Sequence, residues 1–160
     1  MIDQFNDCCN IIKENRQIIF SGYISGLLKN IEYFLVFSNT HSQQDPYQRN
    51  SLGHNSISYI AYPIISKQVI RNIFISYFTD DINTSDITFT INLYVIQNPT
   101  LITSVPSKKS ITFTLKVNNF FGNKLQHINM NIPATSYIAI SITPNIDTST
   151  IDQIIEIVLS

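Results

Sequence analysis

Apolar and polar side chains alternate with a period of two residues along most of this chain. In residues 86–97 five aliphatic or aromatic side chains share one face, and Thr, Asn and Tyr share the other. The same alternation runs through 110–117 and 136–143. A period of two is that of a β-strand. Strands with one apolar face are typical of antiparallel sheets that are covered on one side only.

Shorter apolar runs predict further strands, and two of them differ from the rest. Residues 31–38 and 69–79 are apolar on both faces for part of their length, which suits a central strand or a strand whose outer face meets another subunit. Helical spacing is limited to residues 1–15. The other predicted strands are 17–21, 57–62, 126–132 and 153–159.

Turn-forming residues separate these runs, at 79–83, 98–100, 118–123 and 144–147. The longest polar stretch, 39–56, is interpreted as a surface loop or an irregular sheet edge. About eight or nine short strands with no helices between them predict an all-β fold made of two packed antiparallel sheets. We therefore expect a jelly-roll-type β-sandwich over 17–160, preceded by an N-terminal connector over 1–16.

The composition narrows the range of partners. Hydrophobic residues make up 44% of the 160 residues and charged residues only 13%, so Asn, Ser, Thr and Gln must supply most of the polar surface. A net charge of −1 provides no basic footprint for nucleic acid or an anionic membrane, and we expect neither partner. No apolar run is long enough to cross a membrane, and no signal peptide is visible. Synthesis in a cytoplasm is expected.

The histidines do not form a catalytic or metal-binding pattern. His41 and His54 lie in the polar stretch with Asp45 between them, but their spacing would not place both rings on one side of a helix or strand. Solvated loop histidines are the better interpretation. His127 shares a face with polar residues of its predicted strand and is expected at the surface. The serines lie in no G-x-S-x-G motif, and no glycine-rich phosphate loop is present.

One acidic turn has the oxygen ligands that Ca²⁺ prefers: Asp80 and Asp81 are followed by Asn83 and Asp86. The turn lacks the Gly and the terminal Glu of an EF-hand loop, so ordinary turn chemistry is favoured. We expect no metal, no cofactor and no enzymatic activity.

Cys8 and Cys9 are the only cysteines of the chain. Adjacent cysteines rarely bond to each other, because the small ring distorts the peptide and the disulfide geometry. Any disulfide that they form must therefore join them to other chains. The alternative is a pair of reduced thiols in a cytosolic tail.

Residues from about Ser66 to the C-terminus carry a family resemblance. The segments IRNIFISYFTD, DITFTINLYVIQNPT, SITFTL and MNIPATSYIAISITP, followed by a final strand, resemble the globular C-terminal domain of BclB-type collagen-like exosporium glycoproteins. The match covers about two thirds of the chain. This chain has no collagen-like stalk and is poorer in Gly and Ala than that family.

The N-terminal Cys8-Cys9 pair resembles the connector of endospore appendage (Ena) filament subunits, small jelly-roll proteins joined by disulfides between subunits. The body cysteines that such connectors bond to are missing here, so connectors would have to pair with one another or bind without covalent links. Both resemblances imply a final location on the exterior of a spore or cell. They also imply partners that are copies of the chain itself, with a spore-surface anchor protein as a further candidate.

Three functions are compatible with this sequence. The first is a self-assembling subunit of an extracellular fibre or spore appendage, held by strand-edge pairing and by intermolecular disulfides of Cys8 and Cys9. The second is a trimeric jelly-roll knob or capsid-type protein of a spore surface or virus. The third is a glycan-binding module, for which Tyr47, Tyr59 and Tyr62 are candidate stacking residues.

Overall fold

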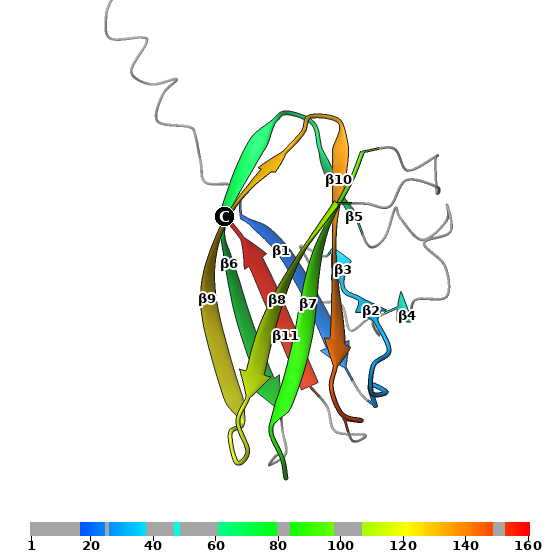
Figure 1. Cartoon of the computed structure of the whole chain (residues 1–160), viewed down its shortest axis with the longest axis vertical. Helices are drawn as coiled ribbons and strands as arrows, with labels where there is room; N and C mark the ends of the chain where they lie inside the picture. Colours follow the sequence, from blue (N-terminus) through cyan, green and yellow to red (C-terminus); the bar gives the residue numbers. More distant parts are fainter. Residues whose placement is uncertain are drawn as a thin grey trace, which may run out of the picture.

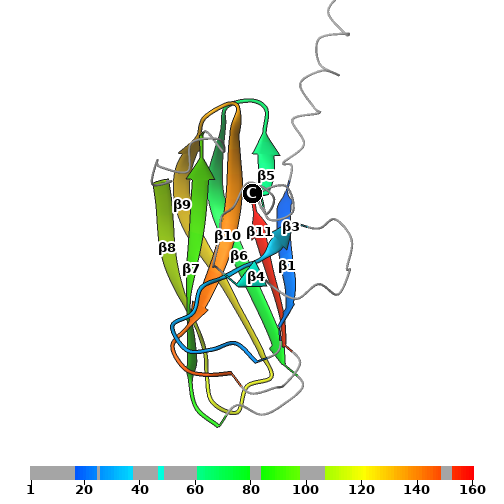
Figure 2. The same ribbon diagram turned by 90° about the vertical axis from the view of Figure 1, so that its right-hand side faces the viewer.

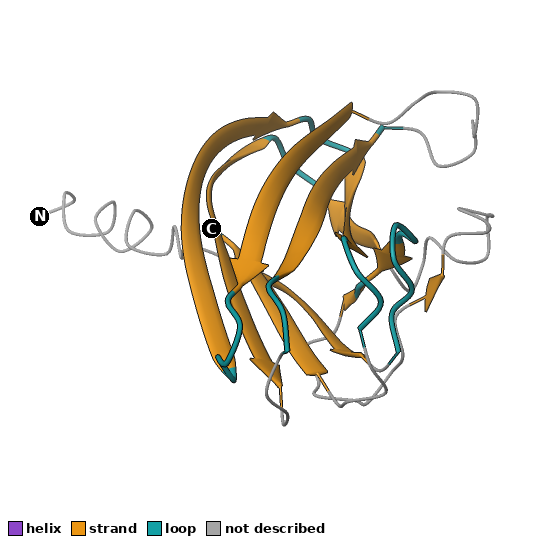
Figure 3. Cartoon of the chain, turned by 60° about the horizontal axis from the view of Figure 1, so that its bottom comes forward, coloured by secondary structure: helices purple, strands orange, loops and turns teal. Residues whose placement is uncertain are grey.

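The computed structural model describes residues 17–24, 26–37, 47–48, 61–79, 84–97, 107–148 and 153–160. Two antiparallel sheets pack face to face, which confirms the predicted all-β sandwich (Figures 1 and 2). Figure 3 shows strands and loops, with no helix, among the described residues. Within those ranges no helix is long and apolar enough to cross a membrane.

Over the described residues, sheet A contains five strands. Their order across the sheet is β3 (Val36–Phe37), β1 (Ile18–Ile24), β11 (Gln153–Leu159), β6 (Gln68–Thr79) and β9 (Phe121–Ile132). Sheet B contains six strands in the part of the chain that the structure describes. Five of them lie in the order β4 (Tyr47–Gln48), β2 (Tyr33–Phe34), β10 (Ser136–Pro144), β7 (Ile87–Ile96) and β8 (Ser107–Leu115), and β5 (Ala61–Ile64) also pairs with β10.

The connections have jelly-roll topology. From β5 onward each strand crosses to the opposite sheet, except that β7 and β8 form a hairpin within sheet B. The strand order in sheet A is β3-β1-β11-β6-β9. In sheet B both β2 and β5 pair with β10, and the order continues β10-β7-β8. In this double Greek key every crossing places one apolar strand face over the face of the other sheet. The two sheets bury a shared core.

Period-two alternation located most of the strands, but several boundaries differ from the prediction. β1 continues to Ile24, β8 begins at Ser107, and β5 spans Ala61–Ile64 where a strand over 57–62 was expected. The predicted strand 31–38 is divided into β2 and β3, because Leu35 turns its backbone N–H toward the Ile140 carbonyl oxygen and its side chain into the core. The stretch 39–56, read as a loop or irregular edge, contains the two-residue strand β4. The predicted turn 118–123 ends early, since β9 already begins at Phe121.

Gly122 explains why that turn was misplaced. Asn and Gly around the Phe-Phe pair are typical of a turn, yet Gly122 lies within β9 opposite Tyr77. A Cβ atom built on Gly122 would lie 2.9 Å from a terminal atom of both Leu115 and Phe113. A larger residue would require the ends of these two β8 side chains to move, so this glycine suits the close packing of β9 on Leu115 and Phe113 and does not mark a turn.

The core lies between the two sheets and consists mainly of isoleucine. On β6 the inward side chains Ile73, Ile75 and Tyr77 are at most 1% exposed, and on β10 Ile138 and Ile140 are fully buried. The inward positions of β7, β8 and β11 complete the same cluster. This part of the fold follows directly from the alternation in the sequence.

The buried side chain of Tyr77 places a polar hydroxyl in the apolar core. Its ring packs against Phe89 and Phe113, with centroid distances of 5.2 and 6.3 Å, but its buried hydroxyl has no hydrogen-bond partner in the structure as described. Burial raises the pKa of Tyr77 far above its usual value of 10.0. In the unfolded chain the tyrosine hydroxyl ionises near pH 10, whereas in the fold it stays neutral. The free energy of unfolding therefore keeps its full value below about pH 10 and falls as the pH rises further.

We expect Tyr77→Phe to stabilise the fold by about 1 kcal/mol, since it removes an unpaired buried hydroxyl and keeps the ring. The difference from wild type should grow above about pH 10. Urea unfolding with an unchanged slope would measure it. A loss of stability in Tyr77→Phe at neutral pH would show that the hydroxyl is satisfied in solution.

Candidate interaction surface

The outer face of sheet A carries rows of apolar side chains. Phe78 of β6 lies between Phe121 of β9 and Ile154 of β11, and each pair is in direct cross-strand register. Two rungs further along, Phe74 lies between Leu125 and Val158. Ile19 of β1 continues that second row beside Val158. We call these seven residues the apolar face: Ile19, Phe74, Phe78, Phe121, Leu125, Ile154 and Val158.

The apolar face is open to solvent. The exposed fractions are 38% for Phe74, 45% for Phe78, 47% for Ile154, 53% for Phe121 and 57% for Leu125. These five side chains together leave on the order of several hundred Å² of apolar surface exposed, in two neighbouring rows. Patches of this kind mark interaction surfaces.

A polar row lies between the two apolar rows. Asn123, Ser76, Glu156 and Ser21 are paired in sequence across β9, β6, β11 and β1. Beyond the second apolar row the next rung is again polar: the Asn72 side chain contacts His127 Nδ1 at 2.5 Å and donates to Ser160 Oγ. Polar groups therefore divide the apolar face into two stripes that run across the strands.

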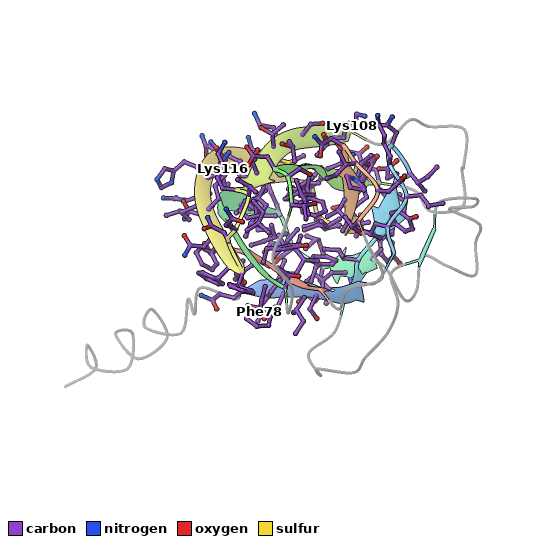
Figure 4. The ribbon with its side chains drawn as sticks, turned by 90° about the horizontal axis from the view of Figure 1, so that it is seen from below. Phe78, Lys108 and Lys116 are labelled. Carbon is purple, nitrogen blue, oxygen red and sulfur yellow. The ribbon has the colours of Figure 1, made fainter. Side chains whose placement is uncertain are left out.

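The outer face of sheet B has a different character. Threonines occupy one end of β7 and β8, where the Thr88 and Thr114 hydroxyls are 3.0 Å apart. Thr112 and Lys108 are exposed on the same face. Figure 4 shows Phe78 and Lys108 on opposite sides of the sandwich. Among the described side chains, exposed rows of large apolar residues therefore lie on the outer face of sheet A.

The other end of the sheet B outer face is closed by a buried polar network. Glu32 accepts hydrogen bonds from the Tyr94 hydroxyl at 2.5 Å, from Asn92 Nδ2 at 3.2 Å and from the Ser141 hydroxyl. Ser110 Oγ donates to Asn92 Oδ1 at 2.7 Å. Tyr94, Asn92 and Ser141 are at most 6% exposed. The network ties β7, β8 and β10 to the residue that precedes β2, so we assign it a structural role.

Phe34 and Tyr94 continue this buried region with a ring centroid distance of 5.7 Å. Ala61, Ile96 and Ala139 complete a second small apolar cluster with them. None of these side chains is more than 9% exposed. The rings of Phe34 and Tyr94 are therefore closed off from solvent, and the half-buried Tyr137 packs against them.

The edge strands β8 and β9 have features that disfavour pairing with a strand of another chain: an inward-pointing lysine and a β-bulge. Lys124 of β9 points toward the sandwich interior and donates from Nζ to the Thr112 carbonyl oxygen of β8, at 2.7 Å. The pairing of β6 with β9 shifts register between Ile70 and Asn72, which marks a β-bulge. Lysines and bulges at an edge are common protections against edge-to-edge association.

A shallow depression of about 460 Å³ lies at this bulge, lined by Arg71, Asn72, His127, Ile128 and Asn129. It is open to solvent, and the His127 ring contacts the Asn72 side chain, an amide that does not titrate. His127 is exposed, which confirms its predicted place at the surface. The depression has no catalytic arrangement.

Most of the other sequence candidates lie outside the described residues. These are Cys8 and Cys9, His41, Asp45 and His54, Asp80, Asp81 and Asn83, Tyr59 and the side chain of Tyr47. Tyr62 is half-buried and packs against the main core.

Asp86 is the described member of the acidic turn. Its two oxygens accept from Lys116 Nζ at 2.7 Å and from the Val117 N–H at 2.8 Å. The Lys116 hydrogen bond, and then that of Val117, lower the pKa of Asp86. In the described ranges no group of three or more His, Cys, Asp or Glu could hold a metal ion.

The sequence indicated only part of the apolar face. Phe74 and Phe78 lie in the predicted strand 69–79, which is apolar on both faces for part of its length, but the sequence does not indicate which face is the outer one. Phe121 was placed in a turn, and Leu125 lies just before the predicted strand 126–132. The irregular alternation of β9, in which Lys124 and Gln126 point inward, hid these residues.

The fold and this surface define a jelly-roll β-sandwich with one apolar outer face. No family model matches the chain, and no curated protein does. Among solved structures it is similar to an N-terminal fragment of endo-1,4-beta-D-xylanase 10B from Clostridium thermocellum, which contains CBM22-1 and GH10 modules with xylohexaose. The TM-score is 0.42 and the identity 16%, over 91% of this chain and 28% of that one.

Proposed function

We propose that the protein is a structural subunit that assembles with copies of itself, with the outer face of sheet A as its noncovalent contact. The observation that carries this proposal is the apolar face, whose five most exposed side chains are 38–57% accessible on an ordered sheet. Burying such a surface against a second copy removes it from water at little electrostatic cost, because the net charge is only −1.

The outer face of sheet A has too few charged groups to attract a strongly charged partner. The polar row that separates the two stripes of the apolar face contains one ionisable group among its described side chains, Glu156. A carboxylate in that position also disfavours insertion of the face into a bilayer, since the charge would have to leave water. The outer face of sheet A of a second copy has the same apolar rows and the same single acid. It therefore fits this surface better than a charged partner or a bilayer does.

The connector residues Cys8 and Cys9 provide a second contact in this proposal. Disulfides between the connectors of different copies would link pairs formed through sheet A, and two different contacts on each subunit are enough to build an open fibre. This arrangement supports the fibre or spore-appendage role that the sequence resemblance implies, with the spore or cell exterior as the location. Strand-edge pairing remains an expectation of the sequence, and the lysine and bulge on β9 argue against that edge.

The test is the mass of the full-length chain in solution. Size-exclusion chromatography with light scattering, run with reductant from low micromolar to near-millimolar concentration, should show a mass that rises above 18.3 kDa as concentration increases. Without reductant, boiled samples should form ladders on a gel, and Cys8→Ser/Cys9→Ser should abolish them. A constant monomer mass with reductant would contradict assembly through sheet A, and a trimer that does not grow would favour the knob.

A further inference from the structure

The order of residues on the apolar face also specifies how two copies meet. Four strands, β9, β6, β11 and β1, carry the rows, and the centre of this group lies between β6 and β11. We propose that two copies pack sheet A against sheet A about a two-fold axis that runs parallel to the strands and passes between β6 and β11. This inference rests on the proposed self-assembly and adds its symmetry and register.

An axis parallel to the strands sets every row opposite the same row of the other copy. Phe78 then faces Ile154, and Phe74 faces Val158, while β9 lies across from β1. Each apolar row therefore meets an apolar row of the other copy, and the polar row meets the polar row. Sheets that pack face to face in proteins keep their strands within about 30° of each other, which this arrangement allows.

Glu156 distinguishes this axis from the alternative. A two-fold axis perpendicular to the strands, placed along the polar row, would also match apolar rows with each other. It would set the Glu156 carboxylates of the two copies directly opposite each other, and facing like charges repel at close range. The parallel axis sets each Glu156 opposite Ser76, whose hydroxyl can donate a hydrogen bond to the carboxylate.

The two ends of the polar row allow a direct test. Asn123 on β9 and Ser21 on β1 lie in the same row but three strand spacings apart, roughly 14 Å within one chain. With the parallel axis Asn123 faces Ser21 of the other copy. With the perpendicular axis each of them faces its own equivalent.

Two chains, Asn123→Cys and Ser21→Cys, are prepared in the full-length Cys8→Ser/Cys9→Ser background and treated with a short bismaleimide. We expect the equimolar mixture to give at least about tenfold more cross-linked dimer than either chain alone. Cross-linking of Asn123→Cys with itself, at a rate equal to the mixture, would overturn the parallel axis and leave the proposed self-assembly standing. A mass that doubles without any cross-link would likewise overturn the parallel axis and leave the proposed self-assembly standing. If the mass stays that of a monomer, both proposals fail.

Discussion

Replacing Glu32 by Leu is expected to lower the free energy of unfolding by about 2–4 kcal/mol. The carboxylate accepts hydrogen bonds from Tyr94, Asn92 and Ser141, which lie on two different strands and are almost completely buried. Its removal takes the shared acceptor away from three donors beneath the surface, and Asn92 Nδ2 then keeps Ser141 Oγ, at 3.3 Å, as its acceptor. Rearranging the remaining hydrogen bonds costs stability. The shift of the urea midpoint, with an unchanged slope, measures the loss.

Two variants give this prediction its control. Glu32→Gln keeps one carbonyl acceptor in place and should lose clearly less stability than Glu32→Leu. Glu156→Leu makes the same substitution on the outer face of sheet A, where no such network exists, and should change stability by less than about 0.5 kcal/mol at low protein concentration. If Glu32→Leu unfolds at the wild-type urea concentration, Glu32 does not hold β7 and β10 to the start of β2.

The inner layers of the sandwich could be predicted from the sequence because local alternation determines them. The inward residues of 86–97, from Ile87 to Val95, are all buried as expected. A strand face that must enter a core needs only the correct side chain at every second position. No knowledge of the neighbouring strand is required, so one sequence is sufficient.

The outer faces could not be predicted in this way, because their character depends on residues far away in the chain. Asn92 and Tyr94 read as surface positions, yet Glu32, sixty residues earlier, buries them in a hydrogen-bond network. Phe121 and Phe78 form one apolar row only because β9 pairs with β6. Alternation within a strand contains no information about which strand lies beside it.

The larger effect is expected on association. Phe74→Asp/Phe78→Asp places two carboxylates in the centre of the apolar face, beside Glu156. In a two-fold contact each substitution is present twice, so the lost burial and the added repulsion are both doubled. We expect the dissociation constant of the noncovalent dimer to rise by about 100-fold or more. The fold should remain intact, because both side chains point out of the sandwich and are 38% and 45% exposed.

Sedimentation velocity over a concentration series tests the central claim most directly, with all chains in the Cys8→Ser/Cys9→Ser background. Ile65→Asp is the matched control, since Ile65 is 86% exposed but lies outside the apolar face, between β5 and β6. The parent chain and Ile65→Asp should associate as concentration rises, whereas Phe74→Asp/Phe78→Asp should sediment as a monomer throughout. Undiminished association of the folded Phe74→Asp/Phe78→Asp variant would contradict assembly through the outer face of sheet A.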